Sequence, residues 1–197
     1  MKHKESFTLL TFYKFVDVQD PEEEVRKHLI FTKDIGMKGR IYIGTEGISS
    51  TVTGNQGQIE AYKLYLNHHP LWKDIADIDI KASPTNGHKF PRMQVKVREE
   101  IVALGKKYSR EEIEEAGNRM QIEEFKKLLD TGNIDDYIVL DMRNNHEYNL
   151  GHFKNAIPAN TLSFRELEEK IEEYKEQFGE KKVISYCTGG IRCEKST

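Results

Sequence analysis

The chain has 197 residues and a net charge of −3, enough length for one large domain or two small ones and too acidic for a protein that coats nucleic acid through overall charge. Hydrophobic residues make up 37% and charged residues 32%, a composition that supports folded cores and argues against a disordered chain. The sequence has neither an apolar stretch of about 20 residues nor a secretory signal, which predicts a cytoplasmic protein that does not enter a membrane.

The first 104 residues predict a small domain in which strands and helices alternate. Asp20 and Pro21 suit a helix start, as N-cap and first helical residue, and Gly36 suits its end. The order β-α-β-β-α-β predicts a ferredoxin-like, acylphosphatase-like α+β domain over residues 1–104. The expected elements are a strand over 7–16, a helix over 20–36, a hairpin over 39–55, a helix from 58 to Pro70, and strands within 77–83 and 93–105.

Residues 105–120 have many charges, two glycines and no firm hydrophobic period. Ser109 and Glu112 have the spacing of a capping box, which predicts one short helix there. We therefore expect a linker over 105–120.

Residues 121–197 predict a second domain, in which apolar strands alternate with helices. Ser163 and Glu166 have the spacing of a helix cap and its capping box. This alternation predicts an α/β domain with a parallel sheet. The expected elements are a helix over 122–132, a strand over 137–143, a turn and strand over 146–159, a helix over 163–179 and a buried strand over 181–187.

Cys187 follows the last predicted strand and begins the loop Thr188-Gly189-Gly190-Ile191-Arg192. Parallel sheets bind ligands at the carboxyl ends of their strands, and glycines allow backbone N–H groups to converge on an anionic sulfur. Such surroundings lower the pKa of a thiol, so Cys187 is the candidate nucleophile. Arg192 stays charged and is expected to hold an anion or the loop carbonyls. The alternative is a structural cysteine at the end of a buried strand.

Cys193 lies just beyond the arginine and is predicted to pack in the first helical turn or to act as a resolving thiol, with its side chain turned away from Cys187. The cysteine and histidine spacing predicts no metal site, and the sequence contains no flavin or nicotinamide motif. His146, Glu147 and His152 are predicted to be turn residues, with Glu147 and His152 bonding turn backbone.

Residues 81–98 contain five basic residues and no acid, in contrast to the glutamate-rich helices. The alternative to a phosphate-facing patch is a solvated strand and loop. The candidates for nucleic-acid contact are Lys89, Arg92, Lys96 and Arg98.

Residues 137–197 resemble a rhodanese domain, through "LDMRNNHEYNLGHFKNAIP" and the active loop "CTGGIRCEK". Together with "YKFV", "EGISSTVTG" and "EIVALG" in the first domain, the chain is similar to the rhodanese-like tRNA uridine hydroxylases. The resemblance implies oxygen-dependent 5-hydroxylation of the wobble uridine of tRNA at position 34, with Cys187 reacting as thiol or persulfide. It implies oxygen as co-substrate and tRNA as partner, with no stable protein partner predicted. The family pattern continues beyond Thr197, so we expect the rhodanese domain to be incomplete here.

Two other functions remain open from the sequence. A plain sulfurtransferase would carry sulfane sulfur on Cys187 and pass it to an acceptor thiol. A degenerate rhodanese fold would bind RNA or protein without turnover. The presence of both Cys187 and Arg192 weakens this second alternative, and the short loop argues against a phosphatase.

Overall fold

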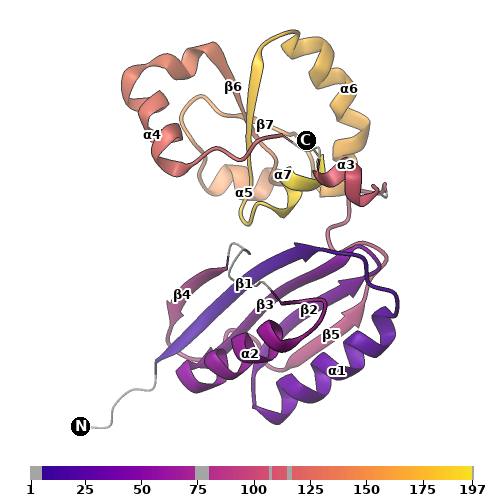
Figure 1. The fold of residues 1–197 in the computed structure, drawn as a ribbon. Helices are drawn as coiled ribbons and strands as arrows, with labels where there is room; N and C mark the ends of the chain where they lie inside the picture. The colour runs from indigo at the N-terminus through magenta and orange to yellow at the C-terminus, as the bar shows by residue number, and fades with distance from the viewer. Residues whose placement is uncertain (1–5, 74–79, 107, 115–116, 197) are drawn as a thin grey trace, which may run out of the picture. The chain divides into compact units, whose positions relative to one another are not determined.

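The computed structural model describes residues 6–73, 80–106, 108–114 and 117–196. The chain divides into two compact units between Ile101 and Val102 (Figure 1). Leu104, predicted as the last residue of the first domain, belongs to the hydrophobic core of the second unit, and Tyr108 of the predicted linker packs against that core.

The first unit has a five-stranded sheet in the order β4-β1-β3-β2-β5. β2 and β5 are parallel, and the other neighbouring pairs are antiparallel. This topology confirms the ferredoxin-like plan and adds β5 at the edge. The elements are β1 (Phe7–Phe15), α1 (Pro21–Asp34), β2 (Lys38–Gly44), β3 (Gly47–Asn55), α2 (Gln56–His68), β4 (Lys81–Thr85) and β5 (Met93–Val97).

The helix starts of this unit follow from capping residues. The Asp20 carboxylate accepts a hydrogen bond from the Glu23 backbone N–H at 3.0 Å, as expected of an N-cap before α1. Asn55 and Gln58 form a reciprocal capping box at the start of α2. The strand predicted within 93–105 ends at Val97, and residues 74–79 of the predicted 77–83 region lie outside the described residues.

Both helices of the first unit lie on one face of its sheet (Figure 1). α1 packs against β2 and β5, while α2 packs against β3 and β1. Alternate strand residues point into the layer between sheet and helices, because side chains of a strand alternate between its faces. The fully buried side chains of this core include Leu10, Phe12, Ile41, Ile43, Ile48, Tyr62, Leu66 and Trp72.

The second unit has a parallel sheet in the order β7-β6-β8, which confirms the predicted α/β class. The Ser109 and Glu112 capping box is present, with mutual bonds of 2.7 and 3.2 Å. The elements are α3 (Arg110–Glu114), α4 (Ile122–Thr131), the 3-10 turn η2 (Asn133–Asp136), β6 (Tyr137–Asp141), α5 (Asn145–Leu150), β7 (Ile157–Pro158), the 3-10 turn η3 (Phe164–Glu166), α6 (Leu167–Phe178), β8 (Lys182–Tyr186) and α7 (Ile191–Ser196).

Three local predictions for this unit are wrong. Residues Asn145–Leu150 form helix α5, because Asn144 and Glu147 make a capping box that starts a helical turn. Glu166 accepts hydrogen bonds from the Leu162 N–H and the Ser163 hydroxyl, so the segment opens as a 3-10 turn without a Ser163 side-chain cap.

The third error concerns β8, which the sequence predicts to be a buried strand. Val183 is 46% exposed, because β8 pairs with β6 and has no second neighbouring strand among the described residues.

No helix of the described parts of the chain is long and apolar enough to cross a bilayer.

Candidate active site at the Cys187 loop

β6 and β8 are parallel, so both strands deliver their last residues to the same edge of the sheet. In register, Asp141 of β6 pairs with Tyr186 of β8, and Cys187 follows at once. The loop then turns through Gly190, whose φ of 92° is a left-handed conformation that favours glycine, and α7 begins at Ile191. The predicted thiol therefore lies at the carboxyl edge of the sheet.

Backbone N–H groups of the loop converge on the Cys187 sulfur. The Gly190 N–H donates to Sγ at 3.0 Å, and the N–H groups of Cys193, Gly189 and Arg192 also stabilise the thiolate. The Cys193 thiol donates to the same sulfur and is the largest cause that lowers the pKa of Cys187, to about 5. Burial opposes this shift without cancelling it. The lowered pKa favours the thiolate form of Cys187 at neutral pH.

The prediction that Cys193 turns away from Cys187 is wrong. One turn of α7 brings the two sulfurs together, and the bond to the Cys187 thiolate, together with burial, raises the pKa of Cys193 above its ordinary value. Cys193 stays protonated and acts as a hydrogen-bond donor to the candidate nucleophile.

Arg192 is paired with a carboxylate that the sequence assigned to turn backbone. Its guanidinium donates to both Glu147 oxygens at 2.8 and 3.0 Å, and the Thr188 hydroxyl donates to the same carboxylate at 2.9 Å. Burial opposes ionisation of Glu147, but these bonds outweigh it and lower its pKa to about 2. Glu147 also accepts from the Asn144 N–H, as predicted for a turn residue. The carboxylate thus ties α5 to both ends of the Cys187 loop.

Comparison with known protein families decides what this combination of units is. Residues 7–101 match the UPF0176 acylphosphatase like domain, and residues 121–197 match the Rhodanese-like domain. The chain therefore joins an acylphosphatase-like domain to a rhodanese-like domain. Cys187 and the loop from Thr188 to Arg192 lie within the region that matches the Rhodanese-like domain.

Curated relatives match both domains. The chain is 40% identical over 189 residues to the tRNA uridine(34) hydroxylase of Staphylococcus carnosus, and 41% identical over 189 residues to that of Staphylococcus saprophyticus. Each match covers 96% of this chain, and the chain spans 58% of the length of these relatives. Among solved structures, an acylphosphatase from Coxiella burnetii matches 49% of this chain and all of its own, at 13% identity and a TM-score of 0.33, too weak a likeness to add to the argument.

A second polar network holds the other wall of the site in the rhodanese-like domain. Arg143 bonds both oxygens of the buried Asp141 carboxylate, at 2.7 to 3.1 Å, and also donates to the Gly151 carbonyl. The Tyr186 hydroxyl donates to Asp141 at 2.6 Å, and burial together with this bond raises the pKa of Tyr186 to about 12. The Arg143 guanidinium is therefore hydrogen-bonded to groups of the protein itself, and its bond to the Gly151 carbonyl holds that turn in place.

A hollow of about 350 Å³ opens beside the sulfur between these two networks. Its volume suits a small molecule or a single base. Its lining consists of Arg143, Gly151, His152, Phe153, Tyr186, Cys187 and Thr188.

The sequence-predicted site residues fall into two groups. Cys187 and the loop from Thr188 to Arg192 lie together in the rhodanese-like domain. Lys89, Arg92, Lys96 and Arg98 are all exposed and belong to the first unit. His152 bonds the Tyr148 carbonyl and stacks on the Tyr148 ring, as predicted for a turn residue. No group of three or more potential metal ligands was found among the described residues.

Sequence reasoning missed Glu147, Arg143 and Tyr186 as parts of the site. Tyr186 directly precedes the candidate nucleophile, and Arg143 lies two residues past Asp141 at the end of β6, so their places at strand ends were the available signals. Glu147 carried no such signal, because its partners lie 41 and 45 residues away along the chain.

Proposed function

We propose that this protein hydroxylates uridine 34 of tRNA at carbon 5 and that Cys187 is the reactive group. The proposed location of this reaction is the cytoplasm. The observation that carries the proposal is a stabilised thiolate at the mouth of a base-sized hollow, in a chain 40% identical to named tRNA uridine(34) hydroxylases. Transfer RNA is the proposed partner, and no stable protein partner is invoked.

The proposed chemistry uses the thiolate as a nucleophile. Addition of the Cys187 sulfur to carbon 6 of uracil makes carbon 5 electron-rich, so that carbon 5 reacts with oxygen. One oxygen atom then remains as the hydroxyl and the other leaves as water, a balance that requires two electrons and two protons from a reductant. Departure of the sulfur as thiolate restores the ring. The N–H groups and the Cys193 thiol that stabilise this thiolate also make it a good leaving group.

The decisive experiment is mass spectrometry of tRNA nucleosides from a strain that lacks this gene and any second hydroxylation pathway. Loss of 5-hydroxyuridine is expected, with recovery on complementation by the wild-type gene and no recovery with Cys187→Ser. Growth under heavy-isotope oxygen gas should place the label in the hydroxyl group. Unchanged nucleoside levels in the deletion strain would overturn the proposal.

A sulfurtransferase activity is the second candidate, because the N–H groups directed at the Cys187 sulfur suit a persulfide as well as a thiolate. In that case the Cys187 thiolate would take the outer sulfur of thiosulfate, with release of sulfite, to form a persulfide. Cyanide would then remove that outer sulfur as thiocyanate and restore the thiolate. Strong thiosulfate-to-cyanide turnover together with unchanged tRNA nucleosides would favour this candidate over the hydroxylase.

A further inference from the structure

One face of the first unit's sheet carries a double row of basic side chains. α1 packs on the other face of β2 and β5, where Ile41, Ile43, Met93 and Val95 are buried. The residues between these buried positions point to the opposite face, because strand side chains alternate. We call their set the β2–β5 face; it consists of Lys38, Arg40 and Tyr42 from β2 and of Arg92, Gln94, Lys96 and Arg98 from β5 and its ends.

The register places the two rows side by side. Arg40 pairs with Gln94 and Tyr42 pairs with Lys96 in the parallel ladder. The ladder continues past β5 at both ends, since the Gly39 N–H donates to the Arg92 carbonyl at 3.3 Å and the Arg98 N–H donates to the Ile43 carbonyl at 2.9 Å. The alternation therefore extends from Arg92 to Arg98, with side chains about 6.6 Å apart along the strand.

The charge of this face is of one sign. Neither β2 nor β5 contains an acidic residue, and the nearest acids along the chain, Glu46 and Glu99, stand beyond the strand ends. Arg40, Lys96 and Arg98 are exposed. A hollow of about 630 Å³ lies along the β5 edge of the sheet next to α1; its lining includes Lys33 of α1 together with Lys38, Arg92 and Lys96 and, among the described residues, no carboxylate. In a chain of net charge −3, this concentration of cations fits a polyanion.

The face also offers groups that read bases. The Arg98 guanidinium lies 5.0 Å from the centre of the Tyr42 ring, a cation–π arrangement that holds a planar cation against an aromatic ring. Arginine planes and aromatic rings on a sheet stack unpaired bases, while a paired duplex hides those base faces. An acidic protein would use the cations but has no planar bases to stack at Tyr42 and Arg98.

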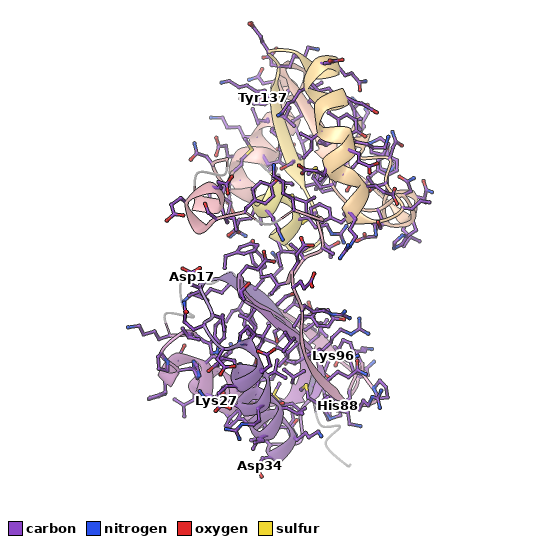
Figure 2. The ribbon with its side chains drawn as sticks, turned by 90° about the vertical axis from the view of Figure 1, so that its right-hand side faces the viewer. Asp17, Lys27, Asp34, His88, Lys96 and Tyr137 are labelled. Carbon is purple, nitrogen blue, oxygen red and sulfur yellow. The ribbon has the colours of Figure 1, made fainter. Side chains whose placement is uncertain are left out.

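We propose that the β2–β5 face binds single-stranded RNA, with its lysines and arginines on the phosphates and with Tyr42 and Arg98 against an unpaired base. This inference deepens the proposed function, on which it rests, because a loop of tRNA supplies such a strand. Figure 2 labels Lys96 of this face and Lys27 of α1 on opposite flanks of the first unit. The helical side, which carries Lys27, therefore provides a matched control surface.

The test is a titration of the intact protein with an unmodified tRNA transcript that has uridine at the wobble position, followed by fluorescence anisotropy at several salt concentrations. The triple variant Arg40→Ala, Lys96→Ala and Arg98→Ala should bind at least about tenfold more weakly. Its salt slope should fall by about 2, since each phosphate contact contributes roughly 0.7 for single strands.

The control removes three cations from the helical side, with Arg26→Ala, Lys27→Ala and Lys63→Ala. Arg26 forms an exposed ion pair with Glu23, so its removal costs little stability. Lys27 pairs with the buried Glu24, so thermal unfolding must show that the control variant is as stably folded as the first triple variant. This variant has the same net charge as the first triple variant and should bind as wild type does. Circular dichroism should show both variants folded.

Two further variants separate the parts of the inference. Tyr42→Leu should weaken binding of the tRNA about fivefold or more while leaving the salt slope unchanged, because stacking involves no counterion. Weak binding of a fully paired RNA duplex, relative to the tRNA, is also expected. Glu173→Gln changes an exposed carboxylate of the other unit, outside the Cys187 site, and should bind with wild-type affinity.

An unchanged affinity and salt slope in the β2–β5 triple variant would overturn the inference, as would an equal loss in the helical control. Either result leaves the proposed function standing if deletion of the gene still removes 5-hydroxyuridine. Conversely, selective loss of RNA binding in the β2–β5 variant with unchanged nucleosides in the deletion strain would support the RNA-binding face and overturn the hydroxylase.

Discussion

In the first unit, His28 is buried among the rings of Tyr62, Tyr65 and Trp72, and its Nε2 atom has no hydrogen-bond partner among the described residues. In the second unit, the carboxylates of Asp141 and Glu147 each face an arginine at 2.7 to 3.1 Å. Burial therefore keeps the first group neutral, whereas strong partners keep the second pair charged. The second unit thus uses ion pairs to hold the loops around the Cys187 sulfur. In the first unit, by contrast, the arginines and lysines of the β2–β5 face lie at the surface.

The largest expected effect concerns the sulfur at the centre of the second unit. Cys187→Ser should lower product formation by at least about 1,000-fold, because a hydroxyl stays protonated where the thiol ionises. The substitution changes little volume, so the midpoint of thermal unfolding should stay near that of wild type. Assay of tRNA hydroxylation by the intact protein measures the rate. Wild-type activity in a folded Cys187→Ser protein would show that the assigned nucleophile is wrong.

Acid should destabilise the first unit before the second. Burial lowers the pKa of His28 from about 6.5 to about 4, so the unfolded state binds more protons between these pH values. The free energy of unfolding should therefore fall by up to about 3 kcal/mol as the pH drops from 6.5 to 4. Denaturation followed by the fluorescence of Trp72, the single tryptophan, reports on this unit.

Two controls sharpen this expectation. His28→Leu should flatten most of the pH dependence between 6.5 and 4, because it removes the group that gains a proton on unfolding. In the second unit, the folded pKa of Glu147 is lowered to about 2, so its contribution is present above pH 4.5 and is lost only as the pH falls toward 2. A first unit whose stability does not change between pH 6.5 and 4 would break the comparison.

The ion pair beneath the loop should matter less than the sulfur itself. Glu147→Gln keeps the shape but weakens the hold on Arg192 and Thr188, and a displaced loop should lower the rate by about 100-fold. Unfolding free energy should fall by about 1–3 kcal/mol. Arg192→Lys should have a similar effect, because lysine loses the planar fork.

The matched control is Glu173→Gln, which replaces an exposed carboxylate of α6 that forms an ion pair with Lys170 at 3.7 Å. Its rate and stability should equal those of wild type. Comparison of the three variants by thermal unfolding and by rate separates positioning of the loop from general loss of charge. Equal rates for Glu147→Gln and Glu173→Gln would refute the positioning role.

The smallest effect is expected at Cys193. Cys193→Ala removes the thiol donor to Cys187 and should raise the pKa of Cys187 by about one to two units from about 5. Activity near neutral pH should change only about twofold, because Cys187 remains largely ionised there. The pH dependence of alkylation by iodoacetamide measures this rise of the Cys187 pKa. Cys193→Ser keeps a hydrogen-bond donor, so the pKa of Cys187 should rise less in that variant. An unshifted profile in Cys193→Ala would show that the donor is dispensable.

The sequence by itself determined the class of both domains and the order of most of their elements, helix α5 being the exception. Asp20 marks a helix start through a bond that spans three residues, Pro21 suits the first helical position, and hydrophobic periods predict strands and helices locally. Cys187 was found for the same reason, because a strand end followed by glycines is a local pattern. The family models confirm both domains.

Only the tertiary structure decided which distant side chains meet. The parallel ladder of β2 and β5 brings Arg40 beside a row of cations more than 50 residues later in the chain. The Glu147–Arg192 pair joins residues 45 apart, and its formation depends on where the α5 capping box places the carboxylate. A local pattern fixes the period of an element but not the register of its neighbours, and register is what assembles the loop and the β2–β5 face.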